Sequence, residues 1–155
     1  MNKLILIISI FFLTGIKLEA QKQTTKAQEP PKKSSKIIVA PNDSAELLNR
    51  IAITLLDKGF EIDRKDNELR TVTTKERSMP KGAAQTKIQA HIIDTVIVFT
   101  SILCVQIEMN LYGVTSKPTF DPVTYSGIKG SYMRVAWNEL DEIARKFGDK
   151  IIYSK

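Results

Sequence analysis

Apolar residues recur every three or four positions near the end of the chain and predict an amphipathic helix there. The apolar stripe consists of Met133, Trp137, Leu140, Ala144 and Phe147. Acidic side chains come early in this segment and basic ones late, as the helix dipole favours. Gly148 is a typical helix stop. Trp137 lies on the stripe, so we expect it in the core and not in a ligand site.

A second amphipathic helix is predicted at residues 44–58. Its apolar positions, again at helical spacing, are Leu47, Leu48, Ile51, Ala52, Leu55 and Leu56. Asp43 and Glu46 stand three residues apart, which is the pattern of a capping box at a helix N-terminus. Gly59 provides the C-terminal stop.

Strand patterns occupy most of the remaining chain. We predict strands at Lys36–Ala40, at residues 86–93 and 96–112, and at residues 151–153, together with a hairpin that turns at Asp66-Asn67. From Leu103 onward apolar and polar residues alternate, which indicates one buried and one wet face. The order β-α-β-β-β-β-α-(β) predicts an α+β fold with two layers: a mostly antiparallel sheet and two helices on one of its faces.

Residues 113–130 contain two prolines, three glycines and several Thr and Ser residues, which predict a long loop. Long loops often carry binding residues. Its aromatic residues, Phe120 and Tyr125, are therefore candidate binding residues.

The beginning of the chain has the pattern of a secretory signal peptide. Lys3 precedes an apolar run that ends at Lys17, and Ala20 provides a small residue for cleavage. The run is too short for a transmembrane helix, which needs about 20 apolar residues. No cysteine stands just after this run, so no lipid anchor is expected. We predict that residues 1–20 are removed and that the mature chain is periplasmic or secreted, without a transmembrane span.

The basic charge of the chain belongs mostly to its N-terminal part. Residues 21–36 carry five lysines and one glutamate, and residues 1–20 carry two lysines and one glutamate, so only +1 of the net +6 remains for residues 37–155. Residues 21–36 contain no large apolar side chain and predict a disordered basic linker. Residues 37–155 then form a single domain, and its near-neutral charge argues against nucleic-acid binding.

The residues able to carry chemistry are few. His91 and Cys104 are the only histidine and the only cysteine, so no metal cluster and no intrachain disulfide are predicted. The two residues suggest a hydrolase dyad, but the sequence around Cys104 contains nothing that would activate a thiol. Asp63, Asp66 and Glu68 lack the spacing of a calcium loop. We predict no catalytic, metal-binding or cofactor-binding residues.

The element order resembles that of small exported α+β domains. The hairpin that runs from Gly59-Phe60-Glu61-Ile62 to Thr71-Val72-Thr73-Thr74 and the closing helix with Ala136-Trp137 and Ile143-Ala144 are similar to those in domains of the outer-membrane barrel-assembly lipoprotein C and in envelope proteins of the Bacteroidetes type. The chain lacks the lipidated cysteine of that lipoprotein. The resemblance implies a binding or scaffolding domain and no catalytic residues.

Together these patterns predict a non-enzymatic interaction or scaffolding domain of the bacterial cell envelope with a protein partner. A carrier of a small molecule or lipid is the alternative, since the core is rich enough in Leu, Ile and Met to line a cavity between the sheet and the helices. Such a carrier needs a pocket of roughly 300 Å³ or more.

Overall fold

A computed structural model of the chain describes residues 29–80, 82–105, 110–111, 114–115, 118–126 and 128–155. Ten strands and two helices are formed by these residues. In chain order they are β1 (Lys36–Ala40), α1 (Leu47–Asp57), β2 (Ile62–Asp66), β3 (Thr71–Thr74), β4 (Arg77–Ser78), β5 (Ala84–Ile93), β6 (Val96–Val105), β7 (Asn110–Leu111), β8 (Val114–Thr115), β9 (Phe120–Pro122), α2 (Tyr132–Arg145) and β10 (Lys150–Ser154).

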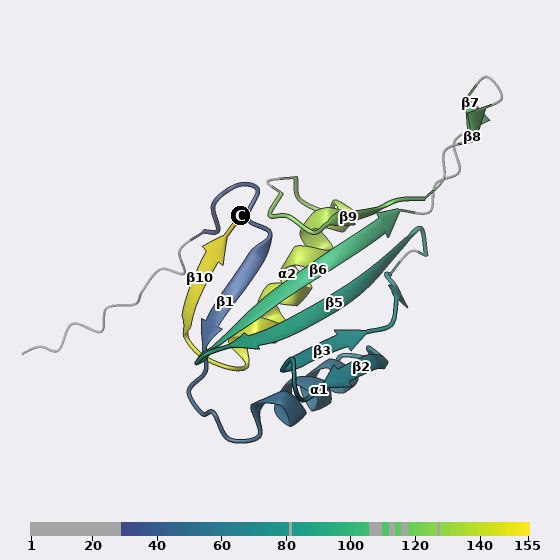
Figure 1. Cartoon of the computed structure of the whole chain (residues 1–155). Helices are drawn as coiled ribbons and strands as arrows, with labels where there is room; N and C mark the ends of the chain where they lie inside the picture. The colour runs from purple at the N-terminus through teal and green to yellow at the C-terminus, as the bar shows by residue number, and fades with distance from the viewer. Residues whose placement is uncertain (1–28, 81, 106–109, 112–113, 116–117, 127) are drawn as a thin grey trace, which may run out of the picture.

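One antiparallel sheet dominates the fold, as predicted. Its strands lie in the order β10-β1-β6-β5-β3-β2, while β4 pairs with β5 and β9 pairs with β6. The N-terminal strand is therefore an inner strand, and the C-terminal strand lies at the edge beside it (Figure 1). Strands β7 and β8 pair only with each other in the described residues.

Both helices lie on the same face of the sheet, behind the strands in Figure 1. Helix α1 covers β2 and β3, and helix α2 covers β1, β5 and β6. Most of the buried side chains lie between the two layers, among them Ile37, Phe99 and Ile88 in the sheet and Trp137 in α2. The α+β architecture with two layers is thus confirmed.

Helix α1 begins later than predicted, and the predicted capping box of Asp43 and Glu46 is not formed. Asp43 accepts a hydrogen bond from the nearby Ala45 backbone N–H at 2.9 Å. Glu46 has a left-handed backbone conformation, and no side chain caps the helix. A local turn at Asp43 therefore competes with the helix, as short acidic side chains often do, and α1 starts at Leu47. Its C-terminal end agrees with the prediction, because Gly59 adopts a φ of 79° there.

Helix α2 follows the prediction closely. The Ser131 hydroxyl accepts a hydrogen bond from the Arg134 backbone N–H at 3.2 Å and so caps the N-terminus. Trp137, Leu140 and Ala144 of the predicted stripe are buried. Trp137 is a core residue, as expected.

The predicted turns are also present. Asp94 and Thr95 join β5 and β6 in a two-residue hairpin in which Ile93 pairs with Val96, and Asp94 takes a left-handed conformation typical of such turns. The hairpin of β2 and β3 turns at Asp66, whose carboxylate accepts a hydrogen bond from the Leu69 backbone N–H. The predicted loop 113–130 contains two short strands, β8 and β9.

The described chain begins within the segment predicted as a linker. Ser34 is buried, and the Tyr125 backbone N–H donates to its carbonyl oxygen at 2.8 Å. The folded domain therefore starts before Ile37. Residues 1–28, with the predicted signal peptide and most of the predicted linker, lie outside the described residues. Neither helix of the described chain is long and apolar enough to cross a membrane.

Candidate functional site

The sheet face turned away from the helices is the candidate functional site, and its most unusual part is strand β6. The side chains of β6 that point toward the helices, such as Ile97 and Phe99, are buried. The intervening positions point to the other face and are occupied by Val96, Val98, Thr100, Ile102 and Cys104. Apart from Thr100 and Ser101, strand β6 is thus apolar on both faces, which is typical of strands covered on both sides.

We call this second face the open face. One row of directly paired residues crosses it from Ile152 in β10 through Ile38, Val98 and His91 to Thr71 in β3. The row is apolar on β10, β1 and β6 and becomes polar on β5 and β3. Residues directly opposite each other in an antiparallel sheet share a face, so the apolar side chains of three strands lie side by side.

Large apolar side chains of the open face are accessible to solvent. Ile152 is 64% exposed, Ile93 is 45% exposed and Phe120 is 41% exposed. No helix of the described chain covers this side (Figure 1). An exposed apolar surface with polar neighbours often marks a protein interaction site.

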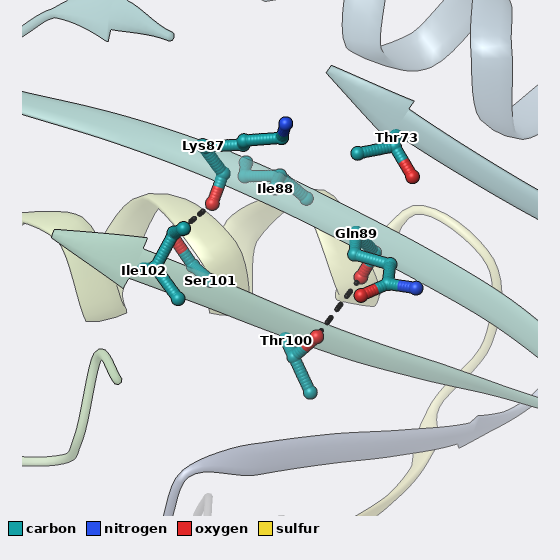
Figure 2. Close-up of a pocket in the computed structure, with 7 residues that line it drawn as sticks. All are labelled: Thr73, Lys87, Ile88, Gln89, Thr100, Ser101 and Ile102. Atoms are coloured by element: carbon teal, nitrogen blue, oxygen red, sulfur yellow. Dashed lines mark hydrogen bonds between the residues drawn. The ribbon is translucent and has the colours of Figure 1, made fainter. Parts of the chain in front are cut away.

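Between β5 and β6 the open face contains a shallow depression (Figure 2). Its lining includes Lys87 and Gln89 from β5 and Thr100 and Ile102 from β6. The depression encloses about 60 Å³, far less than the 300 Å³ or so that a small-molecule site needs. This surface can therefore receive a side chain of a partner better than a free ligand.

Three lysines lie on the open face beside its apolar part. Lys36 on β1 and Lys150 on β10 are exposed, whereas Lys87 on β5 lies 3.5 Å from the Asp63 carboxylate. Among the described residues, the lysines of this face without an ion-pair partner are thus on the side of β1 and β10.

The two candidate binding residues of the loop are placed differently. Phe120 lies in β9 directly opposite Cys104 of β6, so it extends the open face at the far end of β6. That position also explains why Cys104, a residue of the open face, is only 2% exposed.

Tyr125 is buried. Its ring meets Trp137 edge-to-face at 5.9 Å between centroids, and the Arg134 guanidinium lies 4.2 Å from the ring centroid. The Tyr125 hydroxyl donates a hydrogen bond to Glu29. The Tyr125 carbonyl oxygen accepts a hydrogen bond from the Lys33 backbone N–H. These contacts tie the N-terminal segment to α2, so of the two residues Phe120 is the accessible one.

His91 and Cys104 are far apart. His91 is exposed on β5 opposite Val98, and Cys104 is six positions further along β6, which corresponds to about 20 Å of strand. The imidazole and the thiol are therefore beyond hydrogen-bond reach, and the geometry does not form a nucleophile–base pair.

Two of the three acidic residues near the first hairpin, Asp63 and Asp66, have protein partners. Asp66 accepts hydrogen bonds from the Leu69 backbone N–H at 2.9 Å and from the Arg64 guanidinium at 2.5 Å, and these bonds, the backbone one foremost, lower its pKa. Asp63 pairs with Lys87. Within the described ranges, no cluster of three or more His, Cys, Asp or Glu side chains is arranged to hold a metal ion.

A second, wider depression lies where the N-terminus of α1 meets the turn of the first hairpin. It measures about 280 Å³, is open to solvent, and is lined by Ser44, Glu46, Leu47, Leu48, Asn49, Asn67, Arg70 and Ile92. Its polar rim and open shape contrast with the enclosed apolar cavity that the carrier hypothesis requires.

Sequence reasoning missed the open face of β6. The alternation that begins at Leu103 indicates a wet second face, but the preceding segment 96–102 is apolar at every position except Thr100 and Ser101. An apolar run of this kind is typical of a strand with two apolar faces and could have predicted the second apolar face of β6.

The chain matches no protein-family model, and no curated protein is significantly similar to it in sequence.

Proposed function

We propose that this protein is a non-enzymatic interaction domain of the bacterial cell envelope that binds a protein partner through its open face. The observation that carries the proposal is the apolar character of β6 on both faces, combined with helices on only one of them. A strand of this composition is most stable when both of its faces are covered. A partner surface would provide the second cover.

The free energy gained by burying the open face in a complex supports its role as a binding surface. Fully burying a Val, Leu or Ile side chain contributes about 1.5–3 kcal/mol, and the open-face side chains Val98 and Ile38 are already half-buried. Covering them together with Ile152 and Ile93 would therefore contribute a few kcal/mol. The polar side chains on β5 and the lysines on β1 and β10 would add orientation and specificity.

The location in the envelope rests on the sequence of residues 1–36. The predicted signal peptide would export the chain, and the lysine-rich segment after it would act as a tether. The resemblance to exported α+β domains supports the same compartment. No cysteine stands directly after the apolar run, which favours a mature protein without a lipid anchor.

The layer between sheet and helices favours an interaction domain over a carrier. Its centre is filled by large side chains, among them Trp137, Phe60 and Phe99. Phe99 and Phe147 meet with ring centroids 5.6 Å apart. The carrier alternative therefore depends on the open depression beside α1, where a ligand would remain largely in solvent.

Affinity purification from cells tests the proposal. The native protein should recover a distinct envelope protein, and Val98→Lys should lose it because a charge then stands in the apolar row. Val135→Lys is the matched control, since Val135 is 40% exposed on α2 on the opposite side of the sheet. Equal recovery of the partner by both variants, with unchanged folding, would contradict the proposal.

A further inference from the structure

The two edges of the main sheet differ in composition. The β2 edge carries Asp63, Arg64 and Lys65 in succession, and its pairing with β3 is irregular between Ile62 and Arg64. Charged side chains and bulges are the usual means by which a sheet edge is protected against pairing with another chain. Strand β2 is therefore unsuited to accept a further strand.

Strand β10, at the opposite edge, has no bulge in its pairing with β1 and carries charges only at and beyond its ends. It pairs with β1 in a regular register over five residues, and its centre reads Ile151-Ile152-Tyr153 without a charge or a proline. Ile152 is 64% exposed. In the described part of the chain, β10 pairs with β1 alone, so one side of its backbone has no strand partner.

We propose that a second copy of this chain occupies the edge of β10. The two β10 strands would pair antiparallel about a two-fold axis at Ile152. Ile152 would face its own equivalent, Ile151 would face Tyr153, and Lys150 would face Ser154. The edge amides and carbonyls would then form ladder hydrogen bonds between the two copies.

Charge complementarity identifies the occupant as a second copy. Asp149 and Lys155 flank β10 symmetrically about Ile152, and both are exposed. The proposed register brings Asp149 of each copy opposite Lys155 of the other, so two ion pairs form at the ends of the new ladder. Neighbouring registers are poorer: an axis at Tyr153 places Ile151 opposite Lys155, and an axis at Ile151 places Lys150 opposite Ile152.

The dimer would join the two open faces. Ile152 shares its face with Ile38 and Val98, and residues paired across an antiparallel ladder point to the same side. The apolar rows of both copies would thus meet at the axis and form one continuous surface. This inference goes beyond the proposed function and does not depend on it, because self-association requires no envelope partner.

Reversing the flanking charges tests the register. In sedimentation equilibrium of the purified protein, Asp149→Lys alone and Lys155→Asp alone should each weaken the dimer about three- to tenfold, since each places like charges opposite each other twice per dimer. The variant that combines both substitutions should regain the native affinity. A native protein that stays monomeric at millimolar concentration, or a dimer unaffected by either single reversal, would overturn the proposal.

Cysteine cross-linking tests the axis directly in a Cys104→Ala background. Ile152→Cys should form a disulfide-linked dimer under mild oxidation, because directly paired Cα atoms lie about 4.5–5.5 Å apart, which a disulfide can span. Lys150→Cys is the matched control: its two copies would lie four positions apart along the ladder, about 13 Å. Equal cross-linking at both positions, or none at Ile152→Cys, would contradict the proposed axis.

Discussion

The Arg77 guanidinium binds both oxygens of Glu139, at 2.5 and 2.6 Å, and thereby links strand β4 to helix α2. The same guanidinium lies 3.9 Å from the Phe60 ring centroid and donates a hydrogen bond to the Lys58 carbonyl oxygen. One side chain thus connects the end of α1, the middle of α2 and the sheet. Both members of the pair are largely shielded from solvent.

We expect Arg77→Ala to lower the free energy of unfolding by about 2–3 kcal/mol, because it removes a charged hydrogen-bonded pair and a cation–π contact together. Urea denaturation measures the change. Lys75→Ala is the control, since the Lys75–Glu61 pair is well exposed and solvent screens its contribution to stability. Equal losses for the two variants would refute a structural role for Arg77.

Tyr153 gives the protein a stability change at alkaline pH. Its hydroxyl donates to Asp141 at 2.8 Å and accepts from Arg145 at 2.7 Å. Burial, reinforced by the Asp141 carboxylate, raises the pKa of Tyr153 from 10.0 to about 12. The folded state favours the protonated phenol, so this contribution to stability is complete below pH 10 and is lost as the pH rises toward about 12.

Tyr153→Phe should therefore be less stable than the native protein below pH 10, and the difference should shrink toward pH 12. Denaturant unfolding of both proteins at several pH values measures this. A stability difference that stays constant over the whole range would show that Tyr153 ionises normally in the fold.

Gly148 allows the chain to pass from α2 into β10 beside β1. A Cβ atom at this position would lie 2.2 Å from the Ala40 carbonyl oxygen, so Gly148→Ala must displace backbone. We expect a loss of about 2–3 kcal/mol. Gly130→Ala is a control with a φ of 79° and no neighbouring atom within 4 Å of the added carbon, where strain alone costs about 1–2 kcal/mol. A smaller loss of thermal stability for Gly148→Ala than for Gly130→Ala would contradict the close approach of Gly148 to the Ala40 carbonyl oxygen.

The elements governed by local periodicity could be predicted from the sequence. Helix α2 follows from its apolar stripe, and the turns at Gly59 and Asp94 follow from residues suited to left-handed conformations. The start of α1 could not be predicted, because Asp43 is equally suited to a helix cap and to the local turn that it forms. The choice between the two depends on the path of the whole chain.

The open face as a whole could not be predicted from the sequence, because it is defined by tertiary structure. Periodicity identifies β6 as a strand but does not say which strands lie beside it or which face the helices leave uncovered. Phe120 joins the open face only because β9 pairs with the end of β6. Tyr125, chosen by the same loop argument, is buried because α2 supplies Trp137 and Arg134 around it.

Export is open to a direct test at the N-terminus. We expect the mature protein in the envelope fraction or the medium to begin at Gln21, because Ala20 is the small residue before the cut. Intact-mass measurement of the protein from its native host checks this. Recovery of the chain with residues 1–20 still attached would contradict the predicted signal peptide.

The most direct test of the proposed interaction surface is photo-crosslinking in living cells from a single position of the open face. A photoreactive phenylalanine analogue at Val98 should cross-link a distinct envelope protein, identified by mass spectrometry, while the same group at Asn138, exposed on α2, should not. Cross-linking of that protein from Asn138 but not from Val98 would contradict the account, and so would the absence of any product at Val98 in cells that express the folded protein.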